Sequence, residues 1–163
     1  MYNSVEVWFR HKPTAKDYFK KLSLGKALMN WLITLRGKYS HVELVIDNYA
    51  YSAIFDKGVR RTEVGKLNRY EYDVVEVRDV DLEYITEFYL RTKGHKYDIL
   101  GILLSQMFPI NRHCPNKWFC SEWVMNALGY SKTQMHGVNL AYSLLSDRSR
   151  HGIRPKALSY CTL

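Results

Sequence analysis

The sequence has little of what marks a secreted or membrane-spanning protein. Its 163 residues include only three cysteines, Cys114, Cys120 and Cys161, too few for the disulfide framework of a small secreted domain. The first residues show no basic segment followed by an apolar one, so no secretory signal is visible. The longest apolar stretch, 99–108, is too short to span a bilayer. We therefore expect a cytoplasmic protein with no transmembrane segment and with thiols rather than disulfides, although a Cys114–Cys120 bridge is an alternative.

Several common catalytic and binding motifs are also missing. The chain has no phosphate loop, no G-x-G-x-x-G, no G-x-S-x-G and no carboxylate cluster suited to two metals. A zinc site made of His113, Cys114, Cys120 and Cys161 would lack the paired C-x-x-C or H-x3–5-H spacing of such sites. We therefore expect neither a metal nor another cofactor.

The composition is that of a globular protein, with 47% hydrophobic and 25% charged residues, and the length suits one core. We expect a single domain over 1–163. It would consist of a basic N-terminal strand and amphipathic helix (1–38), a core with the candidate site (39–129) and a C-terminal helix and tail (130–163).

The charge is positive and unevenly distributed. A net charge of +8 favours anionic partners such as nucleic acid, a membrane surface or acidic polymers. Eight basic residues and one acidic residue lie between Arg10 and Lys38, whereas 71–87 has seven acidic residues and one basic residue. The two stretches form either a binding face or two solvated surfaces.

Hydrophobic periodicity predicts strands followed by helices. Alternating apolar residues predict strands at 5–9, 39–46, 49–55, 59–64 and 72–77. Three- and four-residue spacing predicts helices within 16–36 and at 82–92, 97–107, 119–128 and 138–145, with a loop at 109–117. Because the connections between strands have hairpin length, we expect an α+β domain, an antiparallel sheet with helices packed on it.

Two segments contain the residues needed for nucleophilic catalysis. Cys120 lies where the helix at 119–128 begins, and the free N–H groups and dipole of a helix start stabilise a thiolate. His41 lies near the start of strand 39–46, on the face it shares with Glu43. A thiol facing an imidazole is the arrangement that a cysteine nucleophile requires. The structural alternatives are a small buried cysteine and a half-buried histidine held by hydrogen bonds.

A general base also needs a group that holds its ring in place. Glu43 is on the face of His41 but only two residues along the same strand, which predicts an awkward approach. Ser52, on the returning strand, is better placed across the ladder but is a weaker orienting group. The pattern leaves Glu43 and Ser52 open as the third member of the site.

The order of these segments resembles that of the permuted papain-fold cysteine hydrolases. This is the circularly permuted branch of the NlpC-type superfamily, with YiiX-like amidases, small phage and bacterial proteins and, more distantly, lecithin retinol acyltransferase. The similar pieces are Tyr-Ser-His-Val-Glu-Leu-Val at 39–45, Asp-Lys-Gly-Val-Arg at 56–60, Tyr-Asp-Ile-Leu-Gly at 97–101 and Phe-Cys-Ser-Glu at 119–122.

The resemblance implies a permuted papain-like fold, with Cys120 as nucleophile, His41 as base and Tyr97 lining the site near the nucleophile. We expect both Tyr97 and Ser52 to be substrate-binding residues. The resemblance also implies that the Cys120 backbone N–H helps to stabilise an oxyanion. YiiX-like members often have a glutamate on the strand after the histidine, at the position that holds Ser52 here, and Glu43 would then substitute for it.

We therefore expect a cysteine-dependent hydrolase or acyltransferase that acts on an amide or ester bond of a peptidoglycan peptide, a lipid or a modified protein. The main alternative is a non-catalytic binding protein of the same fold. Its basic N-terminal region would contact an anionic partner, namely nucleic acid, a membrane surface or a host protein. A dedicated nucleic-acid module is less favoured, because Phe19 and Trp31 have the spacing of a helix core.

Overall fold

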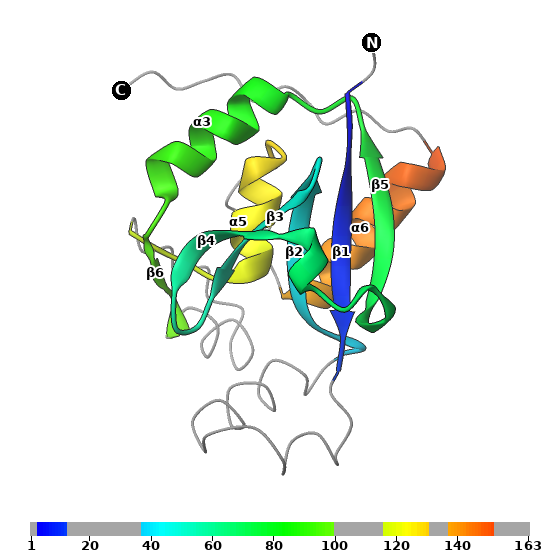
Figure 1. Cartoon of the computed structure of the whole chain (residues 1–163). Helices are drawn as coiled ribbons and strands as arrows, with labels where there is room; N and C mark the ends of the chain where they lie inside the picture. The colour runs from blue at the N-terminus through cyan, green and yellow to red at the C-terminus, as the bar shows by residue number, and fades with distance from the viewer. Residues whose placement is uncertain (1–2, 13–36, 100–115, 131–136, 152–163) are drawn as a thin grey trace.

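The computed structural model describes residues 3–12, 37–99, 116–130 and 137–151. In this part of the chain, an antiparallel sheet of five strands packs against three helices (Figure 1). The strands are β1 (Ser4–His11), β2 (Tyr39–Ile46), β3 (Tyr49–Ile54), β4 (Gly58–Glu63) and β5 (Tyr72–Arg78), and the helices are α3 (Leu82–Thr92), α5 (Cys120–Ala127) and α6 (Val138–His151). The predicted α+β class, with an antiparallel sheet and packed helices, is confirmed.

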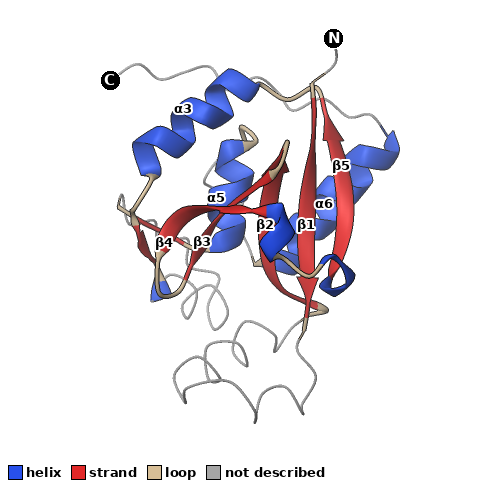
Figure 2. Ribbon diagram, viewed as in Figure 1, coloured by secondary structure: helices blue, strands red, loops and turns tan. Residues whose placement is uncertain are grey.

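The sheet has the order β4-β3-β2-β1-β5, and every neighbouring pair is antiparallel (Figure 2). Asp47 and Asn48 form the tight turn between β2 and β3, and Asp47 takes a left-handed φ of 52°. Positive φ values suit the two-residue turns that match strand twist, and Asp tolerates them better than most residues. This turn sets the β2–β3 register that determines which residues lie beside His41.

Both faces of the sheet are covered. One face packs against the three helices through apolar side chains such as Val7, Phe9 and Leu44, each of which is fully buried. The opposite face has a smaller apolar cluster around Trp8 and Tyr72, and two short 3-10 segments, η1 (Val64–Lys66) and η2 (Arg69–Glu71), connect β4 to β5. Because β2 is central, its side chains are buried on either face, which explains how a charged residue of β2 can be removed from water.

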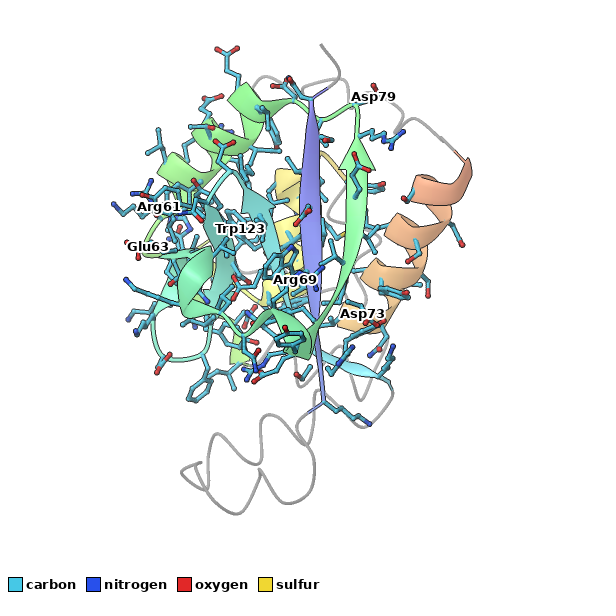
Figure 3. All side chains as sticks on the ribbon, turned by 45° about the vertical axis from the view of Figure 1, so that its right-hand side comes forward. Arg61, Glu63, Arg69, Asp73, Asp79 and Trp123 are labelled. Atoms are coloured by element: carbon cyan, nitrogen blue, oxygen red, sulfur yellow. The ribbon has the colours of Figure 1, made fainter. Side chains whose placement is uncertain are left out.

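Helix α5 is buried on all sides, unlike the half-exposed α3. Trp123 is fully buried, and its indole N–H donates to Thr92 Oγ1 of α3 over 2.9 Å (Figure 3). Gly129 follows the helix with a φ of 80°, the left-handed conformation expected of a C-cap glycine. The predicted helix at 119–128 is thus confirmed, with Cys120 as its first residue.

Two predicted bounds are wrong where the structure describes them. Lys96–Tyr97 form a short strand, β6, so the helix predicted at 97–107 does not begin at Tyr97, and Lys117–Trp118 form its parallel partner, β7, rather than the end of the predicted loop. Strands of two residues are too short to show an alternating pattern, so periodicity does not detect them. Residues 100–115, and the helices predicted within 16–36, lie outside the described residues.

The two ends of the basic N-terminal stretch are paired with the acidic stretch. Arg10 contacts Glu71 at 2.6 Å, and Lys38 contacts Asp73 at 2.6 Å. Asp73, near the end of β5 that follows η2, also accepts a hydrogen bond from His11 at 2.9 Å (Figure 3). These contacts hold the ends of β1 and β2 against β5. Within the described residues, no helix is both long enough and apolar enough to cross a bilayer.

Candidate active site

The site lies where β2 and β3 separate. Pairing between these strands extends only to Leu44 opposite Tyr51, whereas β3 continues to pair with β4 as far as Ile54. In the described part of the chain, the first half of β2 therefore has β1 as its only ladder partner (Figure 1). His41 is in this first half, beside an edge that a side chain from another element can reach.

A β-bulge at the start of β2 contributes to this placement. Arg10 pairs with His41, but the next residue of β1, His11, pairs with Tyr39, so Ser40 is the extra residue. The bulge interrupts the alternation of faces, and bulges often redirect side chains next to functional sites. Because of the bulge, Tyr39 packs with the helical core and does not share the face of His41 and Glu43.

Helix α5 brings the Cys120 thiol to this point. Phe119 is the N-cap residue of α5, and its side chain makes no hydrogen bond to the first turn of the helix. The thiol is free, and its electrostatic influence raises the pKa of both the His41 imidazole and the Tyr97 phenol, so the three side chains lie near one another. The structure thus brings together three of the residues predicted from the sequence, and the alternative Cys114–Cys120 disulfide is wrong.

Glu43 is one of the two residues predicted to hold the His41 ring in place. Its Oε1 lies 3.1 Å from Nε2 of His41, and the carboxylate is only 1% exposed. Two residues of one strand meet here because side chains at i and i+2 share a face, as Glu6 and Trp8 also do on β1. The expected awkward approach of Glu43 is therefore wrong. Since Nε2 faces Glu43, Nδ1 is the ring nitrogen left for the thiol.

Ser52, the other candidate, serves the backbone. Its side chain is fully buried and its hydroxyl donates to the carbonyl of Val42 over 2.7 Å. That carbonyl lies in the part of β2 that no longer pairs with β3, so the hydroxyl replaces a missing ladder hydrogen bond. The expectation that Ser52 is better placed than Glu43 for the imidazole is wrong, because the strands separate before Ser52 can pair across to β2.

Electrostatic contacts change the ionisation of His41 and Glu43. Burial, the largest single influence on His41, favours the neutral ring, but the charge of Cys120 and of Glu43, together with the hydrogen bonds to both, outweighs it and raises the pKa of His41 to about 9. Burial likewise opposes the charged form of Glu43, yet the hydrogen bonds and positive charges of His41 and Arg60 keep its pKa below the usual value. These contacts favour a protonated His41 imidazole beside an ionised Glu43 carboxylate.

Tyr97 reaches Cys120 through the short parallel ladder. Tyr97 pairs with Trp118, two residues before Cys120, and the N–H of Asp98 donates to the Trp118 carbonyl over 3.0 Å. Burial, followed by the charge and hydrogen bond of Cys120, raises the pKa of the Tyr97 phenol. A phenol that keeps its proton is a hydrogen-bond donor, so Tyr97 can donate to sulfur or to a developing oxyanion.

Sequence reasoning missed Arg60, which contacts Glu43. Nη2 of Arg60 lies 2.6 Å from Glu43 Oε1, and the arginine side chain is 17% exposed. Adjacent arginines occupy positions 60 and 61, and residues next to each other on a strand point to opposite faces. The pairing of Arg60 with Ser52 would have identified the inward-facing one, but only once the hairpin register was known.

The thiol is shielded in this structure. Cys120 is 1% exposed, whereas the side chains of His41 and Arg60 are 18% and 17% exposed, so solvent reaches the site at these two groups and not at the sulfur. Among the described residues, no group of three or more His, Cys, Asp or Glu side chains is arranged to hold a metal ion.

Comparison with protein-family models, curated proteins and solved structures finds no match to the chain.

Proposed function

We propose that the protein is a cysteine-dependent hydrolase or acyltransferase that acts on an amide or ester bond. The observation that supports this is the position of the His41 imidazole, which lies 3.1 Å from the Glu43 carboxylate and whose pKa the nearby Cys120 thiol raises. A nucleophile, a base in contact with it, and a third group that orients the base are the parts such catalysis requires. A buried cysteine with a purely structural role needs only apolar neighbours.

The proposed reaction starts from the thiolate–imidazolium pair. The Cys120 sulfur forms a bond to the substrate carbonyl carbon, His41 gives its proton to the departing amine or alcohol, and a thioester remains. Neutral His41 then takes a proton from water, or from another acceptor, as that group attacks the thioester and the thiolate leaves. The Cys120 backbone N–H at the start of α5 and the Tyr97 phenol are the candidate donors to the oxyanion.

The arrangement of elements supports a permuted papain-like fold as part of this proposal. The histidine strand precedes the cysteine helix in the chain, and the start of that helix lies against the histidine strand. The substrates consistent with a thiol–imidazole site are a peptidoglycan peptide, a lipid ester and a modified protein side chain. All three offer a carbonyl carbon that a thiolate can attack.

One observation favours a second candidate, a binding protein of the same fold. Because Cys120 is 1% exposed, a substrate carbonyl reaches the sulfur only if neighbouring groups move. A protein that uses the fold without catalysis would keep its thiol permanently shielded. The two candidates therefore differ in whether Cys120 reacts in the folded protein.

Labelling with iodoacetamide tests the proposal. The parent for this experiment is Cys114→Ser/Cys161→Ser, in which Cys120 is the only thiol. At about pH 6, an ordinary thiol of pKa about 8.5 is less than about 1% thiolate, so alkylation is slow. We expect Cys120 to be alkylated much faster than free cysteine at this pH, and His41→Ala to remove the advantage. Labelling only after denaturation, with circular dichroism showing a folded protein beforehand, would favour the binding protein.

A further inference from the structure

Arg60 contacts the site from a strand that carries none of the other site residues. It lies on β4 opposite Ser52 of β3, and its side chain crosses toward Glu43 on β2. Both side chains of the pair are largely buried, with Glu43 at 1% and Arg60 at 17% exposure. A buried ion pair often adds little net stability, because desolvation offsets much of the attraction. Stability alone therefore does not account for this contact.

The two donors to Glu43 meet at one oxygen. Oε1 accepts from Arg60 Nη2 at 2.6 Å and lies 3.1 Å from His41 Nε2, whereas Oε2 is buried without a hydrogen-bond partner in the described part of the chain. The shorter contact is the one to Arg60. The guanidinium therefore determines which carboxylate oxygen faces the imidazole and keeps the carboxylate ionised beside it.

We propose that Arg60 is a positioning residue of the site: it holds the Glu43 carboxylate against His41 Nε2, so that Nδ1 faces the Cys120 thiol. This inference depends on the proposed function for its catalytic meaning, but the contact it describes can be tested separately. Without Arg60, Glu43 keeps one charged partner in a buried setting, where a carboxylate tends to take up a proton. A protonated or rotated Glu43 no longer fixes the ring of His41.

The variants are Arg60→Met, which removes the charge at similar length, and Arg60→Lys, which keeps the charge but not the guanidinium. The matched control is Arg61→Met, at the next position of β4. Arg61 is exposed, points to the other face, and stacks over the Tyr49 ring at 4.3 Å (Figure 3). Each variant is made in the Cys114→Ser/Cys161→Ser background, and the rate of iodoacetamide labelling of Cys120 is measured across pH.

We expect Arg60→Met to slow labelling at about pH 6 by about tenfold, which corresponds to about 1.4 kcal/mol, because His41 is no longer held beside an ionised carboxylate. The decline of labelling toward acid should begin at higher pH than in the parent, because Glu43 takes up a proton more readily without Arg60. Arg60→Lys should restore the parent pH profile in part, and Arg61→Met should leave it unchanged. If Arg60 had a purely structural role, Arg60→Met would lower the stability of the fold without shifting the pH at which labelling declines toward acid.

Nuclear magnetic resonance of the His41 ring separates the two proposals. If Cys120 of the parent is unreactive but Arg60→Met changes the His41 nitrogen shifts and titration, the hydrolase is refuted and the positioning role stands. If Cys120 is reactive and Arg60→Met leaves both the pH profile and the His41 titration as in the parent, the positioning role is refuted. Should Arg60→Met fail to fold, Arg60→Lys decides the matter by the same two measurements, since unchanged labelling and titration there would also refute it.

Discussion

The pairing of His41 with Cys120 makes a prediction that does not depend on any substrate. Replacing Cys120 with Ser keeps a hydrogen-bonding group of similar size but removes the charge that the sulfur can carry. The charge and hydrogen bond of Cys120 are the largest influences that favour the protonated form of His41, against the opposing effect of burial. The substitution should therefore lower the pKa of His41.

The size of the change follows from the same contacts. The pKa of His41 is raised from 6.5 to about 9 in the folded protein. An opposite charge within contact distance changes a pKa by about 1 to 3 pH units, so Cys120→Ser should lower the value by about that amount. Glu43 still contacts the ring and limits the fall. In the parent, His41 is largely protonated below about pH 8 and loses its proton as pH rises through about 9.

The assay is a titration of the imidazole by nuclear magnetic resonance on protein labelled at histidine, under reducing conditions. Cys161→Ser is the matched control, because it makes the same chemical change at another cysteine. We expect a lower His41 pKa in Cys120→Ser and no change in Cys161→Ser. If His41 titrates at the same pH in parent and Cys120→Ser, the sulfur carries no charge beside the ring, and the ion-pair reasoning is wrong.

Two further predictions concern stability. Ser52→Ala should destabilise the fold by about 1–3 kcal/mol in urea, because the buried Val42 carbonyl loses its donor. It should leave the iodoacetamide labelling of Cys120 unchanged, and a loss of labelling would return Ser52 to the catalytic set. Hydrogen bonds, of which that from Lys38 is the strongest, hold the pKa of Asp73 well below its usual value. Such a carboxylate stabilises the fold above its unfolded pKa of about 3.9 and loses this contribution as pH falls below it. Because the Asp73 side chain is 34% exposed, we expect it to contribute only about 1 kcal/mol to the stability of the fold. Acidification from about pH 5 to about pH 2 should therefore lower the Tm of the parent more than that of Asp73→Asn. Equal decreases in Tm would contradict this.

Local patterns were enough to place the main elements. The strand at 39–46 and the helix at 82–92 have the predicted bounds, because an alternating or helical apolar pattern continues through each. Helix α6 extends to His151, beyond the predicted end at 145, since its last residues are polar and continue no apolar period. The strands β6 and β7 were missed because each gains its structure only from pairing with the other.

Local sequence patterns likewise predicted only some of the residues of the candidate site. Cys120 at a helix start and His41 on a strand followed from the residues around them, since helix caps and strand alternation are local properties. The choice between Glu43 and Ser52 did not, because it depends on where β2 parts from β3 and on what the Val42 carbonyl then lacks.

Sequence by itself determined the types of the longer elements, the antiparallel α+β class and the pair of residues suited to nucleophilic chemistry, because these follow from apolar periods and from connections of a few residues. Tertiary structure alone decided that Arg60 rather than Arg61 faces inward and contacts Glu43. It also decided how far the sulfur is shielded. Those outcomes depend on register and packing between segments far apart in the chain, which no local pattern encodes.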